Sequence, residues 1–161
     1  MKVLIVVDMQ NDFIDGALGT KEAVAIVPNV IETIKGFEGT ILYTKDTHFD
    51  DYMDTQEGKN LPVPHCIKGT DGWNLAEDIE AVKCPQDKVF EKMTFGSKEL
   101  GDYLQRLAIE EDIEELRWWG CVRIFVLFPM HCSLKRIYRK YRLLYCRIAA
   151  PVSRLKAIRM L

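Results

Sequence analysis

The chain has 161 residues, of which 48% are hydrophobic and 29% are charged, and its net charge is −2. That length suits one domain with its own core rather than two, and the apolar runs are far shorter than a membrane span. The first residues resemble a strand rather than a signal peptide, and the five cysteines form no paired framework. We therefore expect a cytoplasmic protein in a reducing setting.

The small net charge hides an uneven distribution along the chain. Residues 1–116 contain 11 of the 22 Lys and Arg residues and all 24 Asp and Glu residues, whereas residues 117–161 contain the other 11 basic residues and no acidic one. A basic tail of this kind can bind nucleic acid or an anionic membrane. A single folded domain rarely divides its charges in this way, so the tail needs its own explanation.

The spacing of apolar residues predicts alternating strands and helices. In chain order, we expect a buried strand at Lys2–Val7, a helix at Val27–Lys35, a strand at Thr40–Thr44, a long polar loop at Lys45–Asp71, a short strand at Lys88–Phe90, a helix at Leu100–Ile109 and a strand from Ile113 onward. Pro28 suits the first turn of the first helix, and Gly36 suits its end. This order predicts an α/β fold with crossover helices.

Charged side chains fall where three of the predicted strands end. Asp8 follows the first strand, and Asp46 and His48 follow the second. Lys92 lies just beyond the third. Because sites in parallel sheets lie at the carboxyl ends of the strands, we expect these side chains to share one edge of the sheet.

Taken singly, two of these residues allow more than one interpretation. A carboxylate that closes a buried strand is costly to desolvate unless it is paired or reactive, so Asp8 is either a cap for the following loop or a functional group. Lys92 alone is better explained as a surface lysine.

The pattern Asp46-Thr47-His48, completed by His65, can place one oxygen and two nitrogens on a single cation. Glu57 lies between the two histidines and could be a fourth ligand, but a solvated loop glutamate is the favoured interpretation. Exposed Asp and His residues are common in loops, so the spacing alone is a weak signal.

Longer segments around these residues carry a more specific signal. The strings VVDMQNDF, DTH with PHC and GTDGW, and VFEKMTFGS resemble the nicotinamidase/isochorismatase-like family of metal-dependent cysteine hydrolases. The resemblance covers residues 1–116 directly. It implies a single isochorismatase-like hydrolase domain over residues 1–161, folded as a three-layer α/β/α sandwich around a mostly parallel, Rossmann-like sheet and commonly a homo-oligomer.

The resemblance also implies roles for these residues. Asp8 would be the base that takes a thiol proton, and Lys92 would stabilise the thiolate, which is the nucleophilic form of cysteine. Asp46, His48 and His65 would hold a divalent metal, Zn or Fe. Because this metal set is complete, the substrate that we expect is a small amide, nicotinamide, hydrolysed to nicotinate and ammonia through a thioester.

One departure from the family makes the substrate less certain than the reaction class. Many nicotinamidases have a ring-clamping aromatic residue three positions before the metal-loop histidine, and here that position is Pro62. Phe13 could supply one face of a clamp, and Trp73 is an unaligned substitute. The alternatives are an isochorismatase-like hydrolase of another small substrate, or a non-catalytic metal- or nucleic-acid-binding protein that uses the basic tail. Without a recognisable nucleic-acid-binding motif, the last is ranked below the enzymes.

The resemblance ends where the nucleophile is expected. In the family, the next strand ends in a cysteine that opens a helix. Here Cys121 follows Gly120 directly, without the expected surroundings, and is better explained as a buried strand cysteine.

A shift of one base in the reading frame offers an explanation for the tail. Read in this way, Glu115–Met130 can become EIEVVGLCTDICVISN, which resembles the nucleophile segment of the family, and acidic residues return. The codons of Trp118-Trp119-Gly120 force Val and then Gly, and the expected cysteine codon straddles Phe125 and Val126. We therefore hypothesise that residues 117–161 are out of frame, so that the chain as written lacks its nucleophile and is inactive.

Overall fold

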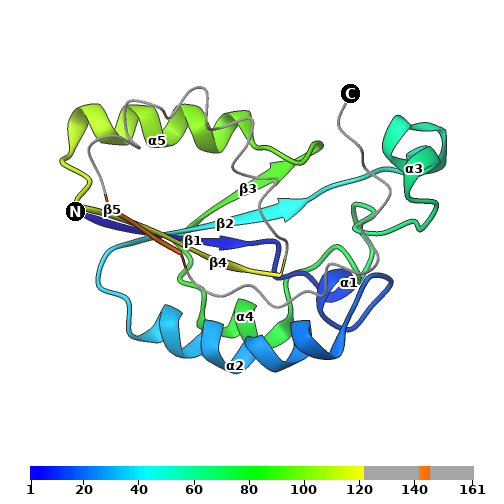
Figure 1. The fold of residues 1–161 in the computed structure, drawn as a ribbon, viewed down its shortest axis with the longest axis horizontal. Coiled ribbons are helices and arrows are strands. Elements are labelled where there is room, and N and C mark those ends of the chain that lie inside the picture. The colour runs from blue at the N-terminus through cyan, green and yellow to red at the C-terminus, as the bar shows by residue number, and fades with distance from the viewer. Residues whose placement is uncertain (122–141, 146–161) are drawn as a thin grey trace.

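The structure is a computed structural model that describes residues 1–121 and 142–145 (Figure 1). Strands and helices alternate along most of this part of the chain. The elements are β1 (Lys2–Val7), α1 (Asn11–Ile14), α2 (Lys21–Lys35), β2 (Thr40–Asp46), the 3₁₀ turn η1 (Tyr52–Asp54), α3 (Gln56–Asn60), α4 (Glu77–Val82), β3 (Lys88–Lys92), α5 (Lys98–Glu110), β4 (Glu115–Gly120) and β5 (Arg142–Tyr145).

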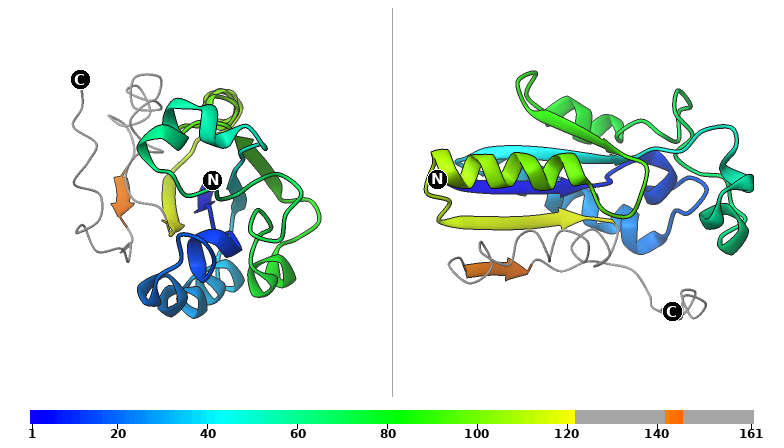
Figure 2. Two further views of the ribbon diagram at one scale, coloured as in Figure 1. Left: turned by 90° about the vertical axis from the view of Figure 1, so that its right-hand side faces the viewer. Right: turned by 90° about the horizontal axis from the view of Figure 1, so that it is seen from above.

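The strands form one parallel sheet in the order β3-β2-β1-β4-β5. Helix α5 covers one face, and α2 and α4 cover the other (Figures 1 and 2). The predicted three-layer α/β/α sandwich with a parallel sheet is therefore confirmed. Helices α1 and α3 lie beyond the carboxyl ends of the strands, where the predicted site residues also lie.

The central strand β1 is buried on both faces, which explains its continuous apolar sequence. Val3, Ile5 and Val7 point to the α5 side, whereas Leu4 and Val6 point to the α2 side. Other buried residues of the α5-side core are Leu42, Leu100, Leu104, Ile113 and Leu116. Those of the α2-side core are Met9, Ile14, Ala23, Ile26, Val30, Ile34, Tyr43, Leu75, Ile79 and Cys121.

Helix α2 begins earlier than the predicted Val27–Lys35. It starts at Lys21, where the hydroxyl of Thr20 accepts a hydrogen bond from the backbone N–H of Ala23. Pro28 therefore lies inside the helix rather than in its first turn, and that part of the prediction was wrong. A proline in this place removes one backbone N–H, and the buried apolar face of α2 outweighs the loss.

The strands β2 and β3 run further than the predicted Thr40–Thr44 and Lys88–Phe90. They end at Asp46 and Lys92, which face each other in register. The helices α1, α3 and α4 were not predicted. Each has four to six residues, which is too short for a helical repeat of apolar residues to stand out.

The end of β4 requires a glycine because the backbone of β1 passes close to it. A Cβ atom at Gly120 would lie 2.0 Å from the carbonyl oxygen of Val7. We expect Gly120→Ala to destabilise the fold by about 1–3 kcal/mol or more. Gly101→Ala is a matched control, because a Cβ there meets no atom within 4 Å inside α5, and it should stabilise by about 0.5–1 kcal/mol. Urea unfolding measures both, and equal effects would contradict the clash.

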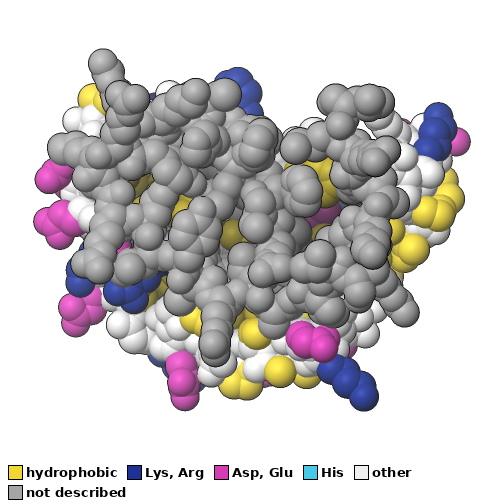
Figure 3. Space-filling view, in the orientation of Figure 1, with side chains coloured by type: hydrophobic (Ala, Val, Ile, Leu, Met, Phe, Trp, Pro, Cys, Tyr) yellow, Lys and Arg dark blue, Asp and Glu magenta, His cyan; other side chains and the backbone are white. Residues whose placement is uncertain are grey.

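The surface of the described part carries charged side chains of both signs. Figure 3 shows them scattered around the margin of one face, among apolar and uncharged groups. No helix within residues 1–121 is long and apolar enough to cross a membrane. The homo-oligomer and the cytoplasmic location stay predictions.

Candidate active site and metal centre

Three buried charged side chains meet at the carboxyl edge of the sheet. Asp8 directly follows β1, and Asp46 and Lys92 are the last residues of the neighbouring strands β2 and β3. The Nζ atom of Lys92 lies 2.9 Å from Oδ2 of Asp8 and 2.9 Å from Oδ1 of Asp46. Their exposed fractions are 0% for Asp8, 6% for Asp46 and 4% for Lys92. One ammonium thus bridges two carboxylates out of contact with water.

The backbone of Asp8 has an unusual conformation that Thr44 holds in place. Its φ angle is +49°, in the left-handed region that non-glycine residues rarely adopt. The N–H of Asp8 donates to the carbonyl oxygen of Thr44 at 3.2 Å, and the Thr44 hydroxyl donates to Oδ1 of Asp8 at 2.7 Å. Backbone strain of this kind concentrates at functional sites, which favours a functional role for Asp8 over a simple cap.

The pKa values of Asp8, Asp46 and Lys92 are shifted in different directions and by different causes. Burial raises the pKa of Asp8, and the charge of Asp46 raises it further against the opposing effect of Lys92. Burial would also raise the pKa of Asp46, but the histidines and Lys92 lower it well below its usual range. The pKa of Lys92 is raised despite burial because both carboxylates stabilise the ammonium. Asp46 therefore stays ionised, whereas Asp8 is suited to accept a proton.

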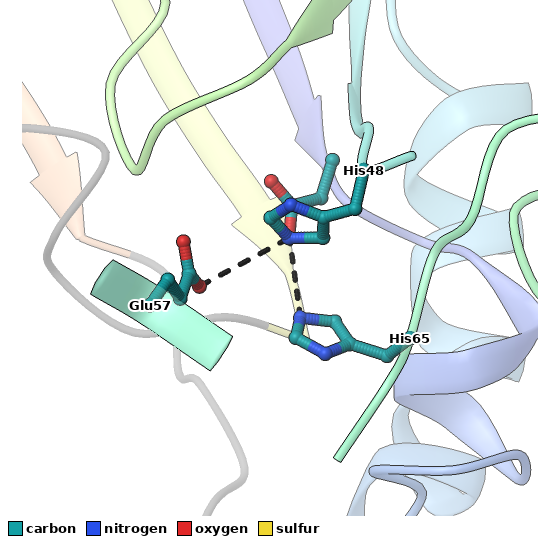
Figure 4. Close-up of side chains that lie close together, drawn as sticks. His48, Glu57 and His65 are labelled. Atoms are coloured by element: carbon teal, nitrogen blue, oxygen red, sulfur yellow. Dashed lines mark hydrogen bonds and ion pairs between the residues drawn. The ribbon is translucent and has the colours of Figure 1, made fainter. Parts of the chain in front are cut away.

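A second cluster shares Asp46 with this triad. Asp46, His48, Glu57 and His65 each offer one ligand atom, and these atoms lie within 4.8 Å of one another. Oδ2 of Asp46 lies 3.1 Å from Nε2 of His48 and 3.6 Å from Nε2 of His65. Figure 4 shows the two rings and the Glu57 carboxylate facing one another, with Glu57 Oε1 4.0 Å from His48 Nε2. The sequence-predicted metal residues thus lie together, Glu57 included.

The donor set fits a divalent cation such as Zn²⁺ or Fe²⁺. Two imidazole nitrogens and carboxylate oxygens are ligands that these ions accept. Nδ1 of His65 lies 2.8 Å from the carbonyl oxygen of Val63, which can only accept, so Nδ1 carries the proton. Burial lowers the pKa of His65, but the hydrogen bonds to Asp46 and to the carbonyl of Val63 raise it overall. In the neutral ring, Nε2 is the nitrogen available for metal ligation.

Aromatic rings surround the histidines. Phe13 packs against His65 with a centroid distance of 5.5 Å, so the predicted substrate residue lies beside the cation cluster. Tyr52 packs against both histidines, at 4.7 Å from His48 and 5.1 Å from His65. Sequence reasoning missed Tyr52, although an aromatic residue four positions after His48 in the predicted metal loop was a usable signal.

Trp73 makes contacts on the other face of β2. Lys45 and Asp46 are adjacent in that strand, so their side chains point to opposite faces. The Nζ atom of Lys45 lies 3.0 Å from the centroid of the Trp73 ring, and the Trp73 indole N–H donates to the hydroxyl of Thr47. The ring is thus held on the Lys45 side. These contacts lend no support to Trp73 as a substrate clamp, and that role stays a prediction.

Two polar residues at the start of helix α1, its N-cap Gln10 and Asp12, were not singled out from the sequence. Gln10 is fully buried, and its amide donates to the carbonyl oxygens of Asp46 at 2.9 Å and Trp73 at 2.8 Å. Its oxygen accepts from the N–H of Asp46 at 2.7 Å. Asp12 accepts a hydrogen bond from the N–H of Cys66 at 2.7 Å. Their place in VVDMQNDF, two and four residues after Asp8, was the available signal.

The cysteines near the site are buried thiols. Cys121 lies one residue beyond β4 rather than within the strand, and it packs in the α2-side core with its thiol 3.4 Å from the sulfur of Met9. Burial, assisted by the charge of Asp8, raises its pKa to about 12. Burial also raises the pKa of Cys66, well above the usual range. Neither thiol is therefore poised as a thiolate.

Most of the tail lies outside the described residues. The positions at which a shifted frame would place the nucleophile, Phe125 and Val126, belong to this part. The described portions of residues 117–161 are the end of β4, Cys121 and β5. The out-of-frame tail therefore stays a hypothesis.

The fold and the site together define an α/β protein in which a buried acid–lysine cluster adjoins a candidate cation site at the carboxyl edge of a parallel sheet. The model of the isochorismatase family, described as the isochorismatase domain, matches residues 2–120. The chain therefore belongs to the isochorismatase family. Comparison with curated proteins gives no match.

Solved structures of amidases resemble the chain. N-carbamoylsarcosine amidase from Thermoplasma acidophilum is 27% identical with a TM-score of 0.70, over 94% of this chain and 85% of that one. The nicotinamidase/pyrazinamidase from Bacillus subtilis is 26% identical with a TM-score of 0.69, over 89% and 82%. Pyrazinamidase of Pyrococcus horikoshii, solved in complex with zinc, shares the fold at 24% identity and a TM-score of 0.63, over 90% and 99%.

Proposed function

We propose that this fold serves a cysteine amidohydrolase that converts nicotinamide to nicotinate and ammonia. The observation that carries the proposal is the Asp8–Lys92–Asp46 triad, because one carboxylate joins it directly to the His48 and His65 cluster. Amidase and nicotinamidase structures among the similar proteins support the reaction class.

In this mechanism, Asp8 takes the proton of a cysteine thiol, and Lys92 stabilises the thiolate that results. The thiolate attacks the amide carbonyl while backbone N–H groups bind the oxyanion. Asp8 returns the proton to the departing nitrogen, which leaves as ammonia, and a thioester remains. Water then adds to the acyl carbon, and the carboxylic acid and the thiol are released. The raised pKa of Asp8 suits a group that must both accept and return a proton.

The cation cluster would orient the substrate. Asp46, His48 and His65 would hold a divalent metal, with Glu57 as a further ligand. A bound metal would supply Lewis acidity to a donor atom of the substrate. Phe13, which contacts the His65 ring, would offer a flat apolar surface to an aromatic amide.

The reading-frame hypothesis would explain the missing nucleophile, and one feature of β4 supports it. Gly120 is glycine in both readings, as its close approach to the backbone of Val7 requires, so it does not distinguish them. The indole nitrogen of Trp118 is buried without a hydrogen-bond partner in the described part of the chain, which is a destabilising arrangement. The shifted reading places Val at position 119 and allows Val at 118, which suits a buried parallel strand.

The test begins with the coding DNA and the mass of the protein. We would resequence the codons for Ile113–Arg123 and measure the intact mass, for which the present sequence gives 18.6 kDa. A protein with the frame restored is expected to release ammonia from nicotinamide, whereas the chain as written is expected to release none. A matched control replaces the restored cysteine by alanine.

The outcomes separate the proposal from its alternatives. Ammonia release from N-carbamoylsarcosine or another small amide, without activity on nicotinamide, would keep the reaction class and overturn the substrate. Activity of the chain as written would overturn the reading-frame hypothesis. A frame-restored protein without amidase activity, but with salt-dependent binding to DNA or RNA in the chain as written, would favour the non-catalytic alternative.

A further inference from the structure

We propose that Asp12 is a positioning residue that fixes His65 by holding the backbone of the next residue, Cys66. The inference rests on the metal set of the proposed function and goes beyond it, because Asp12 is not itself among the clustered ligands. Its carboxylate binds two backbone N–H groups. Oδ2 accepts from Cys66 at 2.7 Å, and Oδ1 accepts from Ala17 at 3.1 Å.

The backbone that Asp12 holds is strained. Cys66 has a φ angle of +49°, and it shares this left-handed conformation with Asp8 alone among the non-glycine residues of the described part. A residue with a Cβ disfavours this region, so a local contact must maintain it. The short bond from the Cys66 N–H to a carboxylate is a charge-assisted hydrogen bond of the strong type.

Cys66 also connects the two histidines. The carbonyl oxygen of Cys66 accepts from the backbone N–H of His48 at 2.9 Å. Asp12 therefore holds one side of Cys66 and His48 holds the other, and His65 precedes it directly in the chain. A rotation of the Cys66 backbone toward an ordinary conformation would shift His65 relative to His48 and Asp46.

The place of Asp12 is closely confined by its surroundings. Its backbone N–H donates to the carbonyl oxygen of Gly72 at 3.1 Å. A Cβ atom at Gly72 would lie 2.2 Å from Oδ2 of Asp12, which is the oxygen that binds Cys66. The backbone at Gly72 thus packs against the Asp12 carboxylate and leaves no room for a side chain at position 72. This packing keeps the carboxylate directed at Cys66.

The experiment compares zinc affinity between variants of the full chain, by competition with a chromogenic chelator. Asp12→Ala is expected to weaken zinc binding by about 10- to 100-fold, the usual effect of removing a group that orients a metal ligand. Asp15→Ala is the matched control, because Asp15 is exposed and carries the same charge three residues away. It should leave the affinity unchanged. Circular dichroism verifies folding, and if Asp12→Ala does not fold, Asp12→Asn replaces it.

A second substitution tests the backbone mechanism. Glycine adopts positive φ angles readily, so Cys66→Gly should reduce the dependence on Asp12. In a double-mutant cycle, Asp12→Ala is therefore expected to weaken zinc binding at least several-fold less in the Cys66→Gly background than in the parent. An effect of the Asp12 charge acting through space would be the same in both backgrounds, and that result would overturn the positioning role.

A measurement without metal provides an independent check. The Cys66 amide should exchange its hydrogen faster in Asp12→Ala than in the parent, while the amides of β1 keep their protection. If the parent binds no zinc, the proposed metal set fails and this inference fails with it. If the parent binds zinc and Asp12→Ala binds equally well, only the role of Asp12 is overturned.

Discussion

Replacing Lys92 by methionine is expected to destabilise the folded chain by about 3–5 kcal/mol, the usual result of removing one partner from a buried ion pair. The ammonium of Lys92 contacts both Asp8 and Asp46, and all three groups are almost fully buried. Methionine fills the space but leaves the two carboxylates facing each other without a cation. Urea unfolding at pH 7 measures the loss.

Lys68→Met is the control for this prediction. Lys68 pairs with Glu91 at the surface, where both side chains are more than one-third exposed, so its removal should change stability by less than about 1 kcal/mol. Equal losses for Lys92→Met and Lys68→Met would contradict a structural role for the triad.

The loss caused by Lys92→Met should depend on pH. In the parent, the pKa of Asp46 is lowered on folding, so its ionised form contributes stability at neutral pH that is lost as the pH falls below about 4. In the variant, protonation neutralises the two carboxylates that have lost Lys92 and relieves their repulsion. The difference in unfolding free energy between parent and variant should therefore shrink on acidification, and a constant difference would indicate lost packing instead.

Asp8→Asn is expected to lower the kcat of the frame-restored enzyme by about 10²- to 10⁴-fold, the usual contribution of a general base. Asparagine keeps the size of the side chain and an oxygen that can accept from the Thr44 hydroxyl, but it cannot take up the thiol proton. Ammonia release under saturating substrate measures kcat. Asp50→Asn, at an exposed position after β2, is the control and should retain full activity.

The stability of Asp8→Asn distinguishes catalysis from structure. Burial raises the pKa of Asp8, which means that its ionised form is disfavoured in the fold, and Lys92 keeps Asp46 as a partner in the variant. We therefore expect a much smaller loss of unfolding free energy than for Lys92→Met. A variant that keeps kcat would show that the base is another group, and one that unfolds like Lys92→Met would show that Asp8 acts mainly in folding.

The local pattern of the chain determined the fold class and the main elements. The continuous apolar run of β1 predicts a strand buried on both faces, and the structure confirms it. The apolar spacing of α5 also predicts a helix close to the observed one. Such patterns can be recognised in a sequence because side chains facing the core recur at every second residue of a strand and at every third or fourth residue of a helix.

Shorter elements and their ends were less predictable. The start of α2 depends on the Thr20 cap. The prediction placed the start near Pro28 instead, because proline is common in the first turn of a helix. Helix α3 has only five residues, yet it carries Glu57 toward His48. A helix of that length is formed by its surroundings rather than by its own propensity, so the sequence left open whether Glu57 was a solvated loop residue.

By itself, the sequence determined which candidate site residues end the strands: Asp8, Asp46, His48 and Lys92 follow apolar runs that predict a parallel sheet. Only the tertiary structure decided how they combine, because the contacts depend on the order and register of strands that are distant in the chain. The register of β2 with β3 sets Asp46 opposite Lys92. In the same way, the loop after α3 returns over helix α1 and brings Cys66 to Asp12. Residue spacing predicted that these side chains share one edge of the sheet, but not which atoms meet there, because those contacts form only when the whole sheet and its two helical layers pack together.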